Sequence, residues 1–318
     1  MCGIFGYIGN QNAAEILLDG LRRLEYRGYD SSGIGVADKG NRARILKAPG
    51  KIQNLAQLIT VDPPQATIGI GHTRWATHGV PNQKNSHPHT DCLNEILVVH
   101  NGIIENHADL KENLLTKGHS FTSDTDSEVI AHLIESGIQE GHSFKTAFVN
   151  SLRKLRGAQA IAAIQSAKPD CIMTTRIGNA GGICIGHGNN EMFLASDIAA
   201  LVPLSDTITF LEPGQTAQVT QSNVVIQNTA GELIFTKPQK VSHNPSTVAK
   251  GQFRHFMEKE IAEQPETIIN AMRGRVDFQS HKIDLSEVTL SKKQLAEINR
   301  IILVAMGTSL HAAMAGAK

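Results

Sequence analysis

The part of the chain that most restricts its fold is the stretch from Ala158 to Phe235. It contains many short apolar runs separated by Gly, Asn, Asp and Pro, a spacing typical of antiparallel strands joined by tight turns, and we expect a meander. A strand-like segment, Cys2–Ile8, and a helical segment, Asn12–Arg23, precede it. Strands come first, then helices, then many strands. This order predicts a layered α+β fold rather than alternating βαβ units.

Further elements are expected between these segments. Helix 108–117 is expected to be capped by Asn106, and helix 127–136 by Thr125 or Asp126. The pair Asn101-Gly102 follows an apolar strand and is a strong turn signal. The remaining predictions are strands at 33–37, 43–47, 67–71 and 95–99, and a short amphipathic stretch at 52–58.

A polar, breaker-rich stretch at 237–252 predicts a linker between two domains, 2–236 and 253–318. The length of 318 residues agrees with about two domains. The second part begins with a helix from Phe253 to about Arg273 and a polar helix near 292–299. It continues with an expected strand at 300–305 and a helix that opens at Gly307.

Composition excludes several classes of protein. Hydrophobic residues make up 41% of the chain, enough for a sizeable core. Lys+Arg and Asp+Glu are both 30, so no basic excess indicates binding to nucleic acid or to a membrane surface. No apolar run approaches the roughly 20 residues of a spanning helix, and no signal peptide is evident. The four cysteines lack C-x-x-C spacing, which indicates a reducing, cytoplasmic environment.

Cys2 is the most informative single residue. Methionine before a small residue is normally removed, which would leave Cys2 at the N-terminus. Cys2 would then carry a thiol and a free α-amine, whose ordinary pKa is about 7.7–8.0. One residue would supply both nucleophile and base. The alternative is a small hydrophobic residue without a catalytic role.

Several other polar residues have two interpretations each. Arg74 could hold a carboxylate bidentately or be a surface residue of a loop. Asn101 and Gly102 could supply two oxyanion donors or form only a turn. Asp126 could receive an ammonium group or cap a helix. Gly307, Thr308 and Ser309 resemble a phosphate-binding loop at a helix N-terminus.

Six histidines raise the question of a metal site. His87-x-His89 could bind zinc, but neither a cysteine nor a carboxylate cluster has suitable spacing, and H-E-x-x-H is absent. We therefore expect structural or hydrogen-bonding histidines and no metal. The six are His72, His78, His87, His89, His100 and His107.

Taken together, these residues resemble the glutamine–fructose-6-phosphate aminotransferase (isomerising) family, the glucosamine-6-phosphate synthases. Phe253–Pro265 resembles the start of that family's sugar isomerase (SIS) half, and Gly307-Thr-Ser309 its first phosphate loop. The motifs of its class II glutamine amidotransferase domain occur in order: Cys2-Gly-Ile-Phe-Gly, Glu25-Tyr-Arg-Gly-Tyr-Asp-Ser-Ser-Gly33, Gly71-His-Thr-Arg-Trp-Ala-Thr-His-Gly79, Val99-His-Asn-Gly-Ile-Ile-Glu-Asn106 and Thr125-Asp-Ser-Glu128.

The resemblance implies a four-layer αββα sandwich, the N-terminal nucleophile hydrolase fold, followed by an incomplete α/β SIS-type segment. It implies hydrolysis of glutamine and transfer of ammonia to fructose 6-phosphate, without a metal or another cofactor, and leaves a homo-oligomer open. By position, Cys2 would attack the amide, and Asn101 and Gly102 would hold the oxyanion. The substrate-binding residues would be Arg74 for the α-carboxylate, Asp126 for the α-ammonium, Trp75 over the ammonia route, and Thr77 and His78 in the pocket.

Some positions depart from the family. The sugar isomerase half would be truncated after 253–318, so fructose 6-phosphate is expected as a substrate only if another chain supplies the missing half. Met306 stands where the family usually has cysteine, and Asn179-Ala180 where it usually has Ser-Pro. We expect a glutaminase. The alternative is a non-catalytic subunit that binds glutamine or regulates a partner synthase.

Overall fold

The computed structural model describes residues 2–37, 43–75, 79–178 and 181–241, and residues 291–317 near the C-terminus. Between these parts it describes residues 257–258, 260–262, 264–265, 268, 276–277 and 282–283. The chain forms two compact units, Met1–Gln252 and Phe253–Lys318. Within the described residues, no helix is both long and apolar enough to cross a membrane.

Two sheets form the middle of the first unit. The eight-stranded sheet contains β1 Gly3–Ile8, β2 Ser31–Ala37, β3 Arg44–Pro49, β4 Ile68–Arg74, β9 Cys184–His187, β10 Met192–Ala195, β11 Thr207–Phe210 and β15 Gln239–Lys240. The seven-stranded sheet contains β5 His89–Thr90, β6 Ile96–Gly102, β7 Gln159–Gln165, β8 Ile172–Ile177, β12 Gln215–Val219, β13 Val224–Gln227 and β14 Leu233–Ile234. Their orders are β15-β11-β9-β10-β1-β4-β2-β3 and β14-β13-β12-β8-β7-β6-β5.

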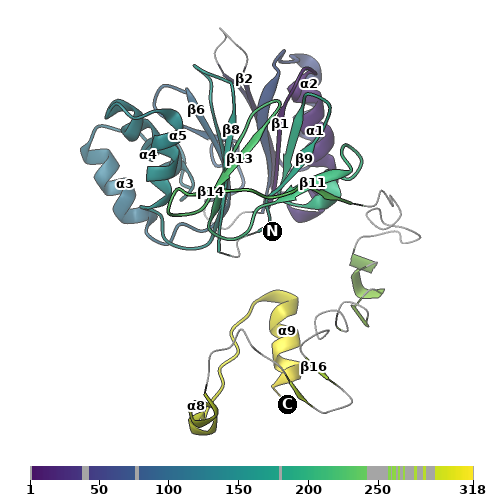
Figure 1. Cartoon of the computed structure of the whole chain (residues 1–318). Helices are drawn as coiled ribbons and strands as arrows, with labels where there is room; N and C mark the ends of the chain where they lie inside the picture. The colour runs from purple at the N-terminus through teal and green to yellow at the C-terminus, as the bar shows by residue number, and fades with distance from the viewer. Residues whose placement is uncertain are drawn as a thin grey trace. The chain divides into compact units, whose positions relative to one another are not determined.

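Helices lie on the outer face of each sheet (Figure 1). Those beside the eight-stranded sheet are α1 Ala13–Leu24 and α2 Ile52–Val61; those beside the seven-stranded sheet are α3 His107–Thr116, α4 Glu128–Gln139 and α5 Phe144–Leu152. Short 3-10 helices span Glu25–Arg27 and Ile198–Ala200. Three apolar cores fill the spaces: one under α1 and α2, one between the sheets, and one under α3–α5. The four-layer αββα sandwich is therefore confirmed.

The first helix shows how the sequence produces a layer. The side chain of Asn12 accepts a hydrogen bond from the Ala14 N–H and starts α1. Leu17, Leu21 and Leu24 follow at helical spacing and are fully buried, as predicted. Burying a leucine contributes about 1.5–3 kcal/mol, so this face fixes α1 on the sheet.

The expected meander between Ala158 and Phe235 is only partly correct. The strands are present, but β9, β10 and β11 pair within the eight-stranded sheet, whereas the others join the seven-stranded sheet. The chain therefore crosses between the sheets after β8 and again before β12. Short apolar runs mark strands, but they do not specify which partner each strand pairs with.

Two of the predicted helix caps are wrong. The Asn106 side chain donates to the Lys154 carbonyl and accepts from the Arg156 N–H, so it does not cap α3. Ser127 precedes α4, and neither Thr125 nor Asp126 caps it. Polar side chains near a helix start can bond to other segments instead.

Two more differences concern a turn and a helix. Asn101-Gly102 is the end of β6, paired with β7, and not a tight turn. Helix α5 was not predicted. Its cap is Ser143, whose hydroxyl accepts from the Thr146 N–H.

The predicted linker and the second unit differ in part from expectation. Gln239–Lys240 forms β15 at the edge of the eight-stranded sheet, while residues 242–252 lie outside the described residues. In the second unit, α8 Lys292–Glu297 has a capping box at Ser291, and α9 spans Gly307–Gly316. β16 Val276–Asp277 pairs antiparallel with β17 Lys282–Ile283.

The strand expected at 300–305 is wrong. These residues have no regular secondary structure, and the described sheets include no pairing for them. A strand requires partners for its backbone groups, which apolar composition alone does not supply. Ile301 and Val304 are 79% and 89% exposed. Of the helix expected from Phe253 to about Arg273, only the parts within 257–268 are described, and they are helical.

Candidate active site

Three strand ends meet at one end of the sandwich. Gly3 in β1 lies opposite Thr73 in β4, so the start of β1 is beside the end of β4. Asn101, near the end of β6 in the facing sheet, contacts Cys2 and His72 at this corner. A Cβ on Gly3 would lie 2.6 Å from Thr73 Oγ1 and 2.8 Å from Leu24 Cβ. Glycine therefore permits the close approach that places Cys2 here.

The Cys2 side chain is held against the chain after β4. The Trp75 N–H donates to Cys2 Sγ at 3.2 Å, and Sγ lies 3.5 Å from the Trp75 carbonyl oxygen. Burial raises the pKa of the Cys2 thiol, although the Trp75 N–H and the Arg74 charge oppose this effect. A neutral thiol of this kind requires a base before it becomes a strong nucleophile.

Asn101 is oriented from both sides of its amide. Its Nδ2 donates to the Cys2 carbonyl oxygen at 3.1 Å, and its Oδ1 lies 3.0 Å from His72 Nε2. The same His72 nitrogen lies 3.1 Å from the His100 carbonyl oxygen, so it serves as the donor to both oxygens. Burial lowers the pKa of His72 to about 3, which keeps the ring neutral. The Asn101 amide therefore points its N–H groups toward Cys2.

A small pocket opens beside Cys2. The lining residues come from the β1 start, the ends of β4 and β6, the loop before β5 and the loop before α4: Cys2, Arg74, Trp75, His87, His100, Gly102, Thr125, Asp126 and Ser127.

The pocket contains one cation and one anion. Arg74 is only 4% exposed, and its Nη2 donates to the Gly79 carbonyl oxygen at 3.2 Å. Burial lowers the pKa of Arg74, while the charges of Cys2 and Asp126 raise it. Asp126 is 3% exposed and accepts from the Ile104 N–H at 2.7 Å. Buried opposite charges in one pocket complement a zwitterion.

The other predicted site residues are distributed as follows. Trp75 is 46% exposed at the pocket mouth, with an edge-on contact to the Tyr29 ring. Gly102 lines the pocket with a φ of +137°, and a Cβ there would lie 2.3 Å from the Ala158 carbonyl oxygen. Thr77 and His78 lie outside the described residues. Gly307, Thr308 and Ser309 begin α9 in the second unit.

Four residues that line the pocket were not among the predicted site residues: His87, His100, Thr125 and Ser127. His87 is buried, and neither ring nitrogen has a hydrogen-bond partner among the described residues. Burial lowers its pKa well below the ordinary value. A buried polar group without a partner is costly and is a candidate to bond a ligand. The histidine-rich stretch was the available signal, but its pattern favoured only a metal-ligand or a structural interpretation of His87.

The buried histidines next to the pocket pack against one another. The rings of His72 and His87 lie 4.1 Å apart, and those of His87 and His89 lie 4.5 Å apart. Among the described residues, the group of side chains with metal-ligand geometry lies elsewhere and contains none of these three.

Comparison with known proteins agrees with this geometry. The family profile described as a glutamine amidotransferase domain matches residues 72–203. Curated relatives named glutamine–fructose-6-phosphate aminotransferase (isomerising) include those of Thermococcus kodakarensis, 43% identical, and Symbiobacterium thermophilum, 42% identical. Each match covers 99% of this chain and 51% of the relative. The chain therefore spans about half the length of these relatives.

Solved structures are similar over almost three quarters of the chain. The glutamine phosphoribosylpyrophosphate amidotransferase of B. subtilis, with ADP and GMP, superposes with a TM-score of 0.61 at 28% identity. That match covers 73% of this chain and 50% of the other. A structure described as the allosteric regulatory enzyme of purine biosynthesis superposes with a TM-score of 0.62 at 29% identity. That match covers 72% of this chain and 49% of the other. The chain thus carries a glutamine amidotransferase domain of the N-terminal nucleophile hydrolase fold and is a homologue of the glutamine–fructose-6-phosphate aminotransferases.

Proposed function

We propose that this chain hydrolyses the side-chain amide of glutamine and that Cys2 is the nucleophile. The observation that carries the proposal is the pocket itself. It combines a thiol, a buried guanidinium from Arg74 and a buried carboxylate from Asp126. Glutamine carries a carboxylate, an ammonium group and a carboxamide, and each finds a complementary group here.

In the first step, Cys2 Sγ attacks the carboxamide carbon. The thiol proton passes to the α-amine of Cys2, which is free once Met1 has been removed, and the carbonyl oxygen gains negative charge. The Asn101 amide N–H and the Gly102 backbone N–H hold that charge. The carbon–nitrogen bond then breaks, and the protonated α-amine of Cys2 returns its proton to the leaving nitrogen. Ammonia and a thioester on Cys2 result.

In the second step, water attacks the thioester carbon and gives its proton to the α-amine. The carbon–sulfur bond breaks, and glutamate leaves as the thiol is restored. Asn101 and Gly102 stabilise this second oxyanion in the same way. Throughout both steps, Arg74 holds the α-carboxylate of the substrate and Asp126 holds the substrate's α-ammonium group. The neutral, buried His87 is placed to bond a polar group of the bound substrate.

The resemblance to longer relatives adds a proposal about where the ammonia goes. In a complete enzyme it would pass to fructose 6-phosphate and yield glucosamine 6-phosphate, with Thr77 and His78 lining the glutamine pocket and Trp75 beside the exit. Gly307, Thr308 and Ser309 would belong to the first phosphate loop of a sugar isomerase domain that begins near Phe253. The cytoplasm is the proposed compartment.

The test is glutamate release by the full chain and by Cys2→Ala. We expect the alanine variant to lose activity while its circular dichroism stays unchanged. Cys184→Ala is the matched control, because that thiol is buried outside the pocket. Wild-type turnover in a folded Cys2→Ala chain would refute the nucleophile. Glutamine binding to the wild-type chain without turnover would instead support a regulatory subunit.

A further inference from the structure

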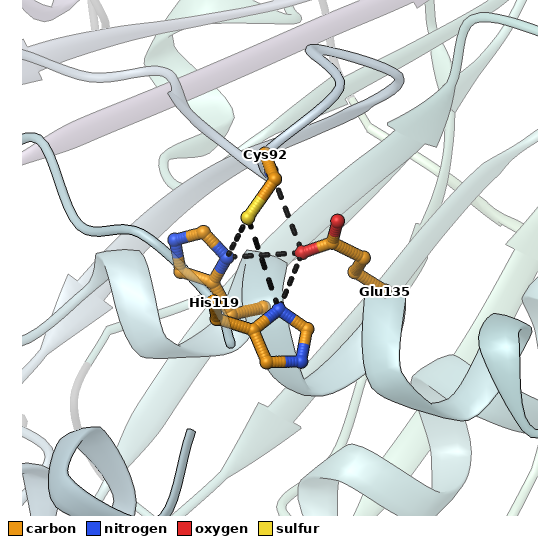
Figure 2. Close-up of side chains that lie close together, drawn as sticks. Cys92, His119 and Glu135 are labelled. Atoms are coloured by element: carbon orange, nitrogen blue, oxygen red, sulfur yellow. Dashed lines mark hydrogen bonds and ion pairs between the residues drawn. The ribbon is translucent and has the colours of Figure 1, made fainter. Parts of the chain in front are cut away.

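Four side chains from three segments converge away from the pocket. Cys92 follows β5, His119 follows α3, and His132 and Glu135 lie one turn apart on α4. Figure 2 shows the Cys92 thiol, the His119 ring and the Glu135 carboxylate turned toward one point. None of the four residues lines the Cys2 pocket.

The distances are close to those of a four-coordinate metal site. Cys92 Sγ lies 3.9 Å from His119 Nδ1 and 3.7 Å from His132 Nδ1. Glu135 Oε2 lies 2.7 Å and 3.1 Å from the same two nitrogens. Bonds of zinc to nitrogen, oxygen and sulfur imply ligand–ligand separations of about 3.3–3.6 Å in a tetrahedron. All four ligand atoms already lie within 4.8 Å of one another, so small side-chain movements suffice.

The surroundings have the features that support metal ligands. The second nitrogen of His132, Nε2, lies 3.6 Å from Glu128 Oε1 and has no hydrogen-bond partner in the described part of the chain. A carboxylate behind a ligating histidine fixes the ring and makes it more basic. The Ser120 N–H donates to Cys92 Sγ at 3.4 Å, which would stabilise a thiolate. His119, His132 and Glu135 are buried, while exposed Cys92 leaves a path for an ion.

Glu135 Oε2 can accept a hydrogen from each histidine and, at 3.4 Å, from the Cys92 N–H, so a hydrogen-bond network without metal also holds these groups together. Such a network does not require the thiol sulfur to lie beside both Nδ1 atoms, whereas a metal site does. Thiolate, two imidazoles and a carboxylate are a donor set typical of zinc.

We propose that Cys92, His119, His132 and Glu135 bind one zinc ion. Four protein ligands leave no open coordination position, so the ion has a structural role. The ion joins the loop after β5 to α4. That loop leads into β6, which ends in Asn101-Gly102. The helix α4 begins shortly after Asp126. Zinc therefore stabilises the segments that position the pocket, without entering the chemistry at Cys2.

The test measures zinc bound by the full chain and by Cys2→Ala, because the Cys2 thiol is a competing ligand. Each protein is incubated with zinc under a non-chelating reductant, gel-filtered and analysed by mass spectrometry of the elements. We expect about one zinc per chain in both proteins, as for a closed structural site. Less than about a tenth of this amount in the folded wild-type chain would overturn the proposal.

Variants then locate the ion. Cys92→Ser and His132→Ala should lose stoichiometric zinc, and Glu128→Gln should weaken zinc binding about 10- to 100-fold in competition with a chromophoric chelator. His142→Ala, at an exposed histidine outside the cluster, is the matched control and should bind normally. In the wild-type chain, cobalt should give a thiolate charge-transfer band that Cys92→Ser lacks. Equal zinc in wild type and folded Cys92→Ser would overturn the assignment, whatever the result for glutamine hydrolysis.

Discussion

Asn101 donates to the Cys2 carbonyl and Arg74 lines the pocket, and substitution of the two residues is expected to change different kinetic constants. An oxyanion donor acts mainly in the transition state, so Asn101→Ala should lower kcat by about 10²- to 10³-fold with little change in KM. Arg74→Lys keeps the charge but loses the bidentate geometry, and Asp126→Asn loses the charge. Both should chiefly raise KM, by about tenfold or more. Steady-state glutaminase kinetics check this, and the opposite pattern would reverse the assigned roles.

The buried histidines make a prediction about stability and pH. Burial lowers the pKa of His72 to about 3, while an unfolded histidine has a pKa of about 6.5. The unfolded state therefore binds a proton that the folded state does not, and stability falls as pH decreases from about 6.5 toward 3. The protonation of His72 in the unfolded state alone should lower the free energy of unfolding by up to about 1.4 kcal/mol per pH unit in this range. Urea unfolding at pH 7.5, 6.5 and 5.5 measures the slope.

His72→Gln separates this effect from general acid sensitivity. The glutamine amide can still donate a hydrogen bond toward the Asn101 Oδ1 but cannot take up a proton. In this variant the free energy of unfolding should depend less steeply on pH, by the contribution of about one proton. His142→Ala, at an exposed position, should keep the wild-type slope. An unchanged slope in folded His72→Gln would contradict the account of a neutral, buried ring.

The sequence identified the chemistry of the site better than its geometry. Cys2, Arg74, Asn101 and Asp126 could be predicted because each lies in a distinctive local motif, and the structure brings all four together. Their roles remain proposals. His87 was not recognised as a pocket residue, because its lack of a partner exists only in the folded chain.

The candidate zinc ligands were missed for a related reason. Cys92, His119, His132 and Glu135 have no conventional metal-ligand spacing along the sequence. They become neighbours only when the loop after β5 and the end of α3 pack against α4. Tertiary contact of this kind is not visible in a search for short motifs.

At the scale of elements, α1 provides a test of close packing. Gly20 lies inside this helix, where alanine would normally be favoured by about 1 kcal/mol. A Cβ at this position would lie 2.5 Å from the Phe5 ring, in the strand that follows Cys2. Gly20→Ala should therefore destabilise the first unit by about 1–3 kcal/mol, as overpacking does. Thermal unfolding measures it, with exposed Glu15→Ala as the control; a stabilised Gly20→Ala chain would contradict this packing.

Helices were easier to predict than strand pairing. The face of α1 follows from its spacing of leucines, which is a local property. The division of β7–β14 between two sheets depends on which strands meet in space, and short apolar runs do not encode it. The strand expected at 300–305 failed because no described partner strand supplies its hydrogen bonds.

At the scale of the whole molecule, the chain spans about half of its curated relatives. Isomerising a sugar phosphate requires a base and a phosphate clamp in one closed cavity. A polypeptide of these 318 residues alone is therefore expected to release glutamate and ammonia from glutamine without converting fructose 6-phosphate to an amino sugar. Separate assays of glutamate and amino sugar decide the matter. Amino sugar formed in step with glutamate, with no second polypeptide present, would contradict the expectation.

Covalent labelling of Cys2 by an electrophilic glutamine analogue tests the central claim most directly. The account predicts about one label per chain, on a peptide that begins at Cys2 because Met1 has been removed, with complete loss of glutamate release. Glutamine should slow the reaction, and Cys2→Ala should remain unlabelled. Mass spectrometry of the intact chain and of its peptides gives both the stoichiometry and the position. Full glutaminase activity with Cys2 unlabelled, or a label at exposed Cys92 that alone abolishes activity, would contradict the account.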